Sequence, residues 1–73
     1  MNISGVDASI VVAPDGTGGA FASARSIGDI NVQIIMEKLG GGGNRSVAAV
    51  QFPDISREAA IEKVREAIDD YLS

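Results

Sequence analysis

The sequence predicts an α+β fold: a small mixed three-stranded sheet, built in the order β-β-α-β-α, with two helices packed on one face. Alternating residue patterns flank a turn-rich segment at residues 14–19, which is typical of a β-hairpin. Two later segments repeat apolar residues at helical spacing, and a short run of small and β-branched residues separates them. A right-handed crossover through the first helix would make the third strand parallel to its neighbour and leave Phe21 and Arg25 on the open face.

The first two predicted strands cover residues 6–13 and Ala20–Ser26. In the first strand, alternate positions form the more deeply buried face: Val6, Ala8, Ile10 and Val12. In the second strand, alternation places three alanines on one face and Phe21, Ser23 and Arg25 on the other. We expect a helix to approach the alanine face closely. The third strand, Val47–Phe52, ends at Pro53, which has no N–H for a sheet hydrogen bond.

Capping patterns mark the starts of the two helices. Ser26 and Asp29 form an S-x-x-D pattern, which predicts a first helix beginning near Gly28 or Asp29. Its apolar stripe contains Val32, Ile35, Met36 and Leu39, with Ile30 and Ile34 widening it to a second buried side. The last helix begins after Ser56, a favourable N-cap, with Glu58 in its first turn. Its stripe contains Ile61, Val64, Ile68, Tyr71 and Leu72.

The composition excludes several classes of function. The 73 residues include no Cys and no His, so disulfides, thiolate metal sites and imidazole-based catalysis are excluded. Ten acidic and six basic residues give a net charge of −4, which is unfavourable for general binding to nucleic acid. No apolar stretch approaches the roughly 20 residues of a membrane span, and the amino terminus has no signal-peptide pattern. We expect one cytoplasmic domain, residues 1–73, without membrane contact.

Four consecutive glycines at residues 40–43 follow the first predicted helix. One glycine after a helix end is commonly needed for a left-handed backbone conformation. Each further glycine costs roughly 0.5–1 kcal/mol of chain entropy relative to Ala. Such a run favours a loop whose backbone a ligand approaches closely, where successive N–H groups can bind an anion. A tight turn with no ligand remains an equal alternative.

Arg25 ends the second strand, and Asn44 and Arg45 follow the glycines. Two guanidinium groups beside a donor-rich loop would suit a phosphate. A parallel pairing of the second and third strands would separate Arg25 from the glycine loop, whereas an antiparallel pairing would bring them together. On spacing alone, the sequence favours a different role for Arg25, a surface ion pair with Asp7 or Asp29. No carboxylate cluster is visible, and we expect no catalysis from this chain alone.

Residues 23–33 and 35–43, together with Ala48 and Ala49, resemble the DHH-associated domain, first type, of DHH-family phosphoesterases. The similarity is greatest to the carboxy-terminal end of GdpP/YybT-type cyclic-di-AMP phosphodiesterases, which are membrane-anchored proteins of Gram-positive bacteria. It rests on the Ser-x-Arg-Ser strand end, the Asn-containing helix start and the glycine run before an Ala-Ala strand, and it covers residues 6–71.

The resemblance implies a mixed sheet with flanking helices and a division of labour between two domains. In that family a separate DHH domain holds two manganese ions that activate water against a phosphodiester, and the associated domain closes over it. The family's arginine and Gly-Gly-Gly-His loop contact the nucleotide. They match Arg25 and the glycines Gly41, Gly42 and Gly43, whereas Asn44 stands where the family usually has His.

The resulting hypothesis is a nucleotide-binding domain, non-catalytic alone, at the C-terminal end of a larger manganese-dependent phosphodiesterase anchored in the bacterial membrane. Its candidate phosphate-binding residues are Arg25, Ser26, Gly41, Gly42, Gly43, Asn44 and Arg45, with no catalytic or metal-binding residue. The chain itself would bind no cofactor. Expected partners are the DHH domain of the same protein, a cyclic dinucleotide or short oligonucleotide, and a second copy in a homodimer.

Two alternatives remain open at the sequence level. Within the same superfamily, the chain could be the substrate-binding domain of a nanoRNase or a RecJ-like single-strand exonuclease. From a different class, it could be a purely structural packing or dimerisation module, whose glycine loop is only a turn.

Overall fold

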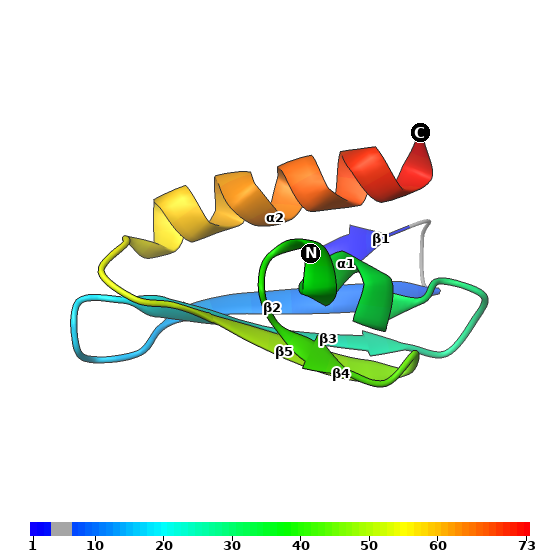
Figure 1. Cartoon of the computed structure of the whole chain (residues 1–73), viewed down its shortest axis with the longest axis horizontal. Helices are drawn as coiled ribbons and strands as arrows, with labels where there is room; N and C mark the ends of the chain where they lie inside the picture. The colour runs from blue at the N-terminus through cyan, green and yellow to red at the C-terminus, as the bar shows by residue number, and fades with distance from the viewer. Residues whose placement is uncertain (4–6) are drawn as a thin grey trace.

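The computed structural model describes residues 1–3 and 7–73, as a five-stranded sheet with two helices on one face (Figure 1). The strands are β1 (Asn2–Ile3), β2 (Ala8–Pro14), β3 (Ala20–Ser26), β4 (Gly42–Gly43) and β5 (Val47–Phe52), and the helices are α1 (Val32–Lys38) and α2 (Arg57–Leu72). The α+β class and the one-sided helix layer confirm the sequence prediction. Val6, which was expected in the first strand, lies outside the described residues.

The sheet has the strand order β1-β2-β3-β5-β4, and all of its pairings are antiparallel. The predicted mixed, three-stranded sheet is therefore wrong in strand number and in direction. The two additional strands, β1 and β4, have two residues each, which is too short to show alternation in sequence. The described bounds of β3 and β5 agree with the prediction.

The connection between β3 and β5 runs from residue 27 to residue 46 and contains the short helix α1. β5 pairs antiparallel with β3, so the predicted crossover to a parallel strand does not form. Instead, the Ser26 N–H donates to the Ser46 carbonyl at 2.8 Å, and β5 starts beside the end of β3.

The start of α1 also differs from the prediction. The N-cap is Asn31, whose side-chain oxygen accepts hydrogen bonds from the N–H groups of Gln33 and Ile34 at 3.1 and 3.3 Å. The Ser26 hydroxyl instead donates to the Asp7 carbonyl and accepts from the Gly28 N–H, so the S-x-x-D pattern does not cap the helix and Asp29 precedes it. The N–H of Asn31 donates to the Tyr71 hydroxyl at 3.0 Å, which ties the start of α1 to the end of α2.

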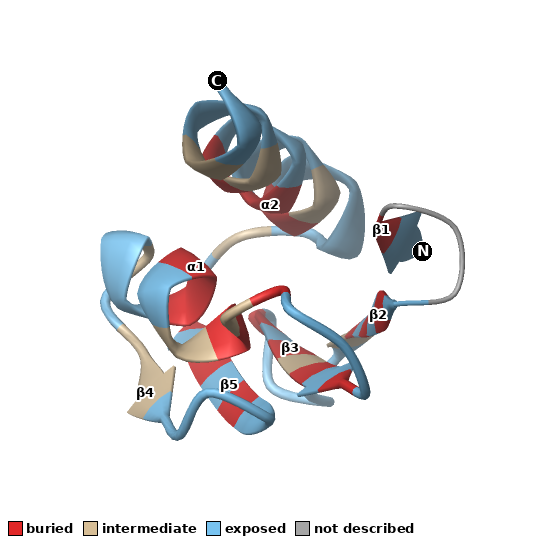
Figure 2. Ribbon diagram, turned by 90° about the vertical axis from the view of Figure 1, so that its right-hand side faces the viewer, coloured by how far each residue is buried: buried red, intermediate tan, exposed pale blue. Residues whose placement is uncertain are grey.

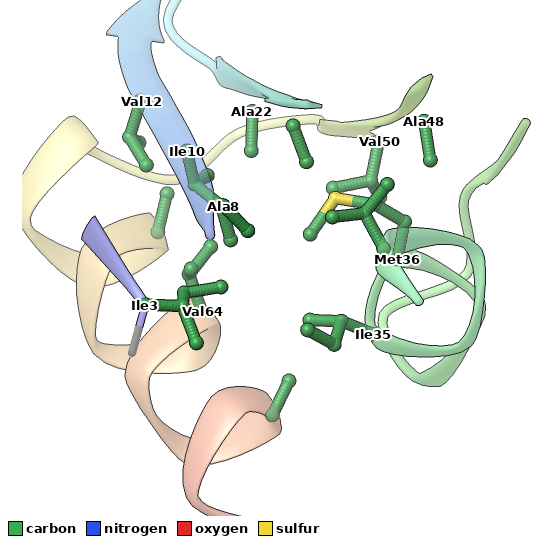
Figure 3. Packing of buried hydrophobic residues seen from close by; sticks show 14 of the residues in the cluster. Ile3, Ala8, Ile10, Val12, Ala22, Ile35, Met36, Ala48, Val50 and Val64 are labelled. Carbon is green, nitrogen blue, oxygen red and sulfur yellow. The ribbon is translucent and has the colours of Figure 1, made fainter. Parts of the chain in front are cut away.

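The core lies between the helices and the inner face of the sheet (Figures 2 and 3). The three alanines of β3 are fully buried, which confirms the expected close approach of a helix to this strand. Figure 3 shows Met36 of α1 extending toward Val50 of the sheet, whereas Val64 of α2 lies on the other side of the cluster, near Ile3. These large side chains fill the space that the small sheet residues leave.

The two helices bury narrower stripes than predicted. Ser56 caps α2 by accepting from the Ala59 N–H at 3.1 Å, and Glu58 lies in the first turn, as expected. The buried residues of α2 are Ala60, Val64 and Ala67, with Ile61, Ile68 and Tyr71 packed at the edge of the core. Ile34 and Leu72 are 43% and 53% exposed, so the expectation that they are buried is wrong. Among the described helices, none has the length and apolarity needed to span a membrane.

The β2–β3 hairpin loop is held by one carboxylate. Asp15 Oδ1 accepts from the Thr17 N–H and hydroxyl, both at 2.8 Å, and from the Gly19 N–H at 3.1 Å. The bonds from Thr17 favour the ionised form and lower the pKa of Asp15 below its ordinary value of 3.8. The loop therefore depends on a charged Asp15.

We predict that the ionisation of Asp15 makes the stability of the chain depend on pH in the acidic range. Because its pKa is lower in the folded state than in the unfolded state, its contribution is present above the ordinary Asp pKa and is lost as the pH falls through the folded-state pKa. The free energy of unfolding, measured in urea, should therefore fall more steeply with decreasing pH for the native chain than for the Asp15→Asn variant. Asp29→Asn is the matched control and should unfold with the same pH dependence as the native chain. The prediction would be contradicted if the Asp15→Asn variant also kept the native pH dependence.

Candidate functional site

The sheet face opposite the helices is open and carries the first candidate residue. Its outward positions, given by the alternation and register of three long strands, are Ser9, Val11, Ala13, Phe21, Ser23, Arg25, Val47, Ala49 and Gln51. Arg25 is exposed and has Ser9 and Val47 as its cross-strand partners. Antiparallel pairing thus places Arg25 beside the start of β5, next to the β4–β5 turn. The sequence left open whether Arg25 lies near the glycine segment. The antiparallel pairing places both at the same end of the sheet.

Three of the four glycines have structural reasons to be glycine. Gly40 has φ +92°, and the N–H groups of Gly40 and Gly41 bond to the carbonyls of Glu37 and Met36, which ends α1 in a Schellman motif. A Cβ on Gly41 would collide with the Ala49 carbonyl and with Val50. Gly43 has φ +146°, and a Cβ there would collide with β5. The expectation of three surplus glycines is therefore wrong.

Gly42 is the exception within this segment. It has no left-handed φ, and a Cβ at this position would meet no atom within 4 Å. Its cross-strand partner is Ala49, so a side chain at Gly42 would lie on the open face, the same face as Arg25. The described fold thus gives no reason for the absence of a side chain at Gly42.

Asn44 closes the β4–β5 turn. Its backbone N–H donates to the Val47 carbonyl at 2.7 Å, and its Oδ1 accepts from the N–H groups of Ser46 and Val47, both at 2.9 Å. The side-chain oxygen is therefore used within the turn, while Nδ2 remains the side-chain donor that faces solvent. The sequence carries a signal for this role, because Asn commonly bonds a backbone N–H two residues later.

Arg45 and Ser26 occupy different surroundings. Arg45 is exposed at the tip of the turn, and its carbonyl accepts from the Val32 N–H at 3.1 Å, which links the turn to the start of α1. Ser26 is only 9% exposed and alternates with Arg25, so it lies on the inner face. Its hydroxyl bonds to the carbonyls of Asp7 and Gly28 at 3.3 and 3.4 Å. The structure brings Arg25, Asn44 and Arg45 to one end of the sheet, with Arg25 on the open face and Ser26 on the inner face.

Arg25 and Arg45 take part in no ion pair among the described residues, although Asp7 lies at the same end of the sheet. The ion pairs of the described residues are Lys38–Asp70 and Arg57–Glu58, so they include neither Arg25 nor Arg45, and the expected pairing of Arg25 with Asp7 or Asp29 does not occur. Within residues 1–3 and 7–73, no group of three His, Cys, Asp or Glu side chains could hold a metal ion. Two arginine side chains and the Asn44 amide are the available donors for a ligand.

The comparison with protein families decides the classification. The DHHA1 domain family matches residues 1–73. This chain belongs to the DHHA1 domain family. The match confirms the resemblance that the strand end, helix start and glycine run indicated.

Curated relatives of this DHHA1 domain include cyclic-di-AMP phosphodiesterases. The chain is 51% identical over 72 residues to the cyclic-di-AMP phosphodiesterase GdpP of Geobacillus thermodenitrificans, covering 99% of this chain. It is 46% identical, with the same coverage, to GdpP of Bacillus subtilis, and 49% identical to the cyclic-di-AMP phosphodiesterase PdeA of Listeria monocytogenes, covering 97% of this chain. The chain spans 11% of the length of each of these relatives.

We predict that the glycines of this DHHA1 domain differ in their structural cost. Gly41→Ala should destabilise the chain by about 1–3 kcal/mol, because its Cβ would overpack against β5. Gly42→Ala should leave the stability unchanged or raise it by up to about 1 kcal/mol, since the position is open and Ala has less unfolded-state entropy. Urea unfolding of both variants is the measurement. If both variants lost the same free energy of unfolding, Gly41 would not pack closely on β5 and the prediction would be wrong.

Proposed function

We propose that this chain is the dinucleotide-binding domain of a cyclic-di-AMP phosphodiesterase and that it is not catalytic alone. Arg25, Asn44 and Arg45 bind phosphate at the surface that Gly42 leaves bare, and Gly41 and Gly43 let the glycine segment pack closely on β5. Ser26 fixes the strand end that presents Arg25. The hydrolytic chemistry, with its manganese, belongs to a DHH domain elsewhere in the full-length protein, as the family resemblance implies.

Gly42 is the single observation that carries this proposal. The described fold leaves its Cβ position empty, on the face that presents Arg25. A constraint from outside the chain explains the glycine: a ligand lies close to the backbone there. The relatives' names provide the ligand class, a cyclic dinucleotide of adenosine.

The glycine segment contributes space rather than backbone donors. The N–H groups of Gly40, Gly41 and Asn44 all donate within the chain. They are therefore not available to form the anion-binding nest that four consecutive glycines suggested. The charged donors must come from the two arginines, whose guanidinium groups bind phosphate oxygens in a bidentate manner.

The first functional prediction concerns Arg25 and Gly42. In the full-length protein, Arg25→Ala should weaken the binding of cyclic-di-AMP and of its linear dinucleotide product about tenfold or more, because a charged hydrogen-bond pair is lost. Gly42→Val should weaken both by obstructing the approach of the ligand, with no loss of thermal stability. Isothermal titration calorimetry measures the affinities.

Arg65→Ala is the control for the loss of one exposed positive charge, because Arg65 lies on α2, on the helical side of the sheet. This variant should bind like the native protein. Unchanged affinity in both Arg25→Ala and Gly42→Val would refute the site and would favour a structural packing module.

The second functional prediction separates the two roles of Asn44. Asn44→Asp keeps an oxygen that can accept from the Ser46 and Val47 N–H groups, but it replaces the Nδ2 donor with negative charge. We expect nearly native thermal stability and about tenfold weaker dinucleotide binding. Asn44→Ala should instead cost about 1 kcal/mol of stability, because it removes the turn bonds. Native affinity in Asn44→Asp would remove Asn44 from the site.

A further inference from the structure

Phe21 is an aromatic side chain on the open face of the sheet. It is 37% exposed and lies in the middle of a row with Ala13 on β2 and Gln51 on β5. Both helices pack against the opposite face, so no described element covers the ring (Figures 1 and 2). Its cross-strand neighbours are Ala13, which has a small side chain, and Gln51, which has a flexible one.

The charge of the open face suits an anionic ligand. Arg25 is the only charged residue among the nine outward positions of β2, β3 and β5, and none of them is acidic. The chain as a whole has a net charge of −4, so its carboxylates are concentrated elsewhere. A face that combines one arginine with an exposed aromatic ring has the donors and the stacking surface of a nucleotide site.

The spacing along β3 joins this ring to the proposed phosphate site. Arg25 and Phe21 share a face and are four residues apart, which corresponds to about 13 Å along the strand. Ser23 lies between them, with Ala49 and then Gly42 beside it across the sheet. All three are small, so the surface between the guanidinium and the ring is unobstructed for a dinucleotide.

We propose that Phe21 stacks on one nucleobase of the bound dinucleotide while Arg25 holds a phosphate. This inference rests on the proposed function and adds the base subsite to it. Stacking requires the flat π-face of an aromatic ring, whereas packing against another protein surface needs only apolar bulk. Phe21 therefore makes the domain prefer base-bearing ligands over phosphate and sugar alone.

The test compares two ligands in the full-length protein by calorimetry: the linear adenosine dinucleotide, and its abasic analogue with the same phosphates and sugars. Phe21→Leu should weaken dinucleotide binding about tenfold and leave binding of the abasic analogue unchanged. Phe21→Tyr should restore native affinity, because its ring still stacks. Val11→Ala is the matched control, since Val11 is an exposed apolar residue on the same face and should have no effect.

The outcomes separate this inference from the proposed function. Native dinucleotide affinity in Phe21→Leu, with weakened binding of both ligands in Arg25→Ala, would overturn the base subsite alone and would leave Phe21 as an apolar contact for another domain. Native affinity for both ligands in Arg25→Ala would overturn the phosphate site and the inference that depends on it. Because Phe21 is on the surface, thermal unfolding of each variant should match that of the native protein.

Discussion

The hydrogen bond between the Ser26 N–H and the Ser46 carbonyl fixes the arrangement on which the candidate site depends. It continues the antiparallel ladder of β3 and β5 into the connection, so the chain leaves and re-enters the sheet at the same end. Arg25 thereby becomes a neighbour of Val47 and of the turn that carries Asn44 and Arg45. Without this closure, the arginine and the glycine segment would belong to opposite ends of the sheet.

The sequence predicts those parts of the fold in which burial imposes a simple period. The alternation of alanines in β3 and of small and β-branched residues in β5 predicts both strands with the bounds that the structure has. The right-handed crossover rule did not predict the strand direction, because it applies only to parallel neighbours and β5 pairs antiparallel with β3. The start of α1 was predicted incorrectly since Ser26 and Asn31 both suit a cap, and the tertiary bonds of Ser26 removed it from that role.

The places of the candidate residues in the fold were partly predictable from the sequence, whereas their roles stay predictions. The position of Arg25 on the open face follows from alternation alone. The glycines could not be assigned from sequence, because the collisions that a Cβ would meet at Gly41 and Gly43 arise from packing on β5. Only the structure distinguishes these two, which the fold requires, from Gly42, which it does not.

The hydroxyl of Tyr71 has a consequence for the whole domain. It accepts the N–H of Asn31, and the next residue, Val32, donates its N–H to the carbonyl of Arg45. The last turn of α2 is thus a brace that runs through the first residues of α1 to the tip of the β4–β5 turn. A change that unwinds the end of this helix would therefore act on the arginine turn without touching it, so the last turn of α2 supports the candidate site from a distance.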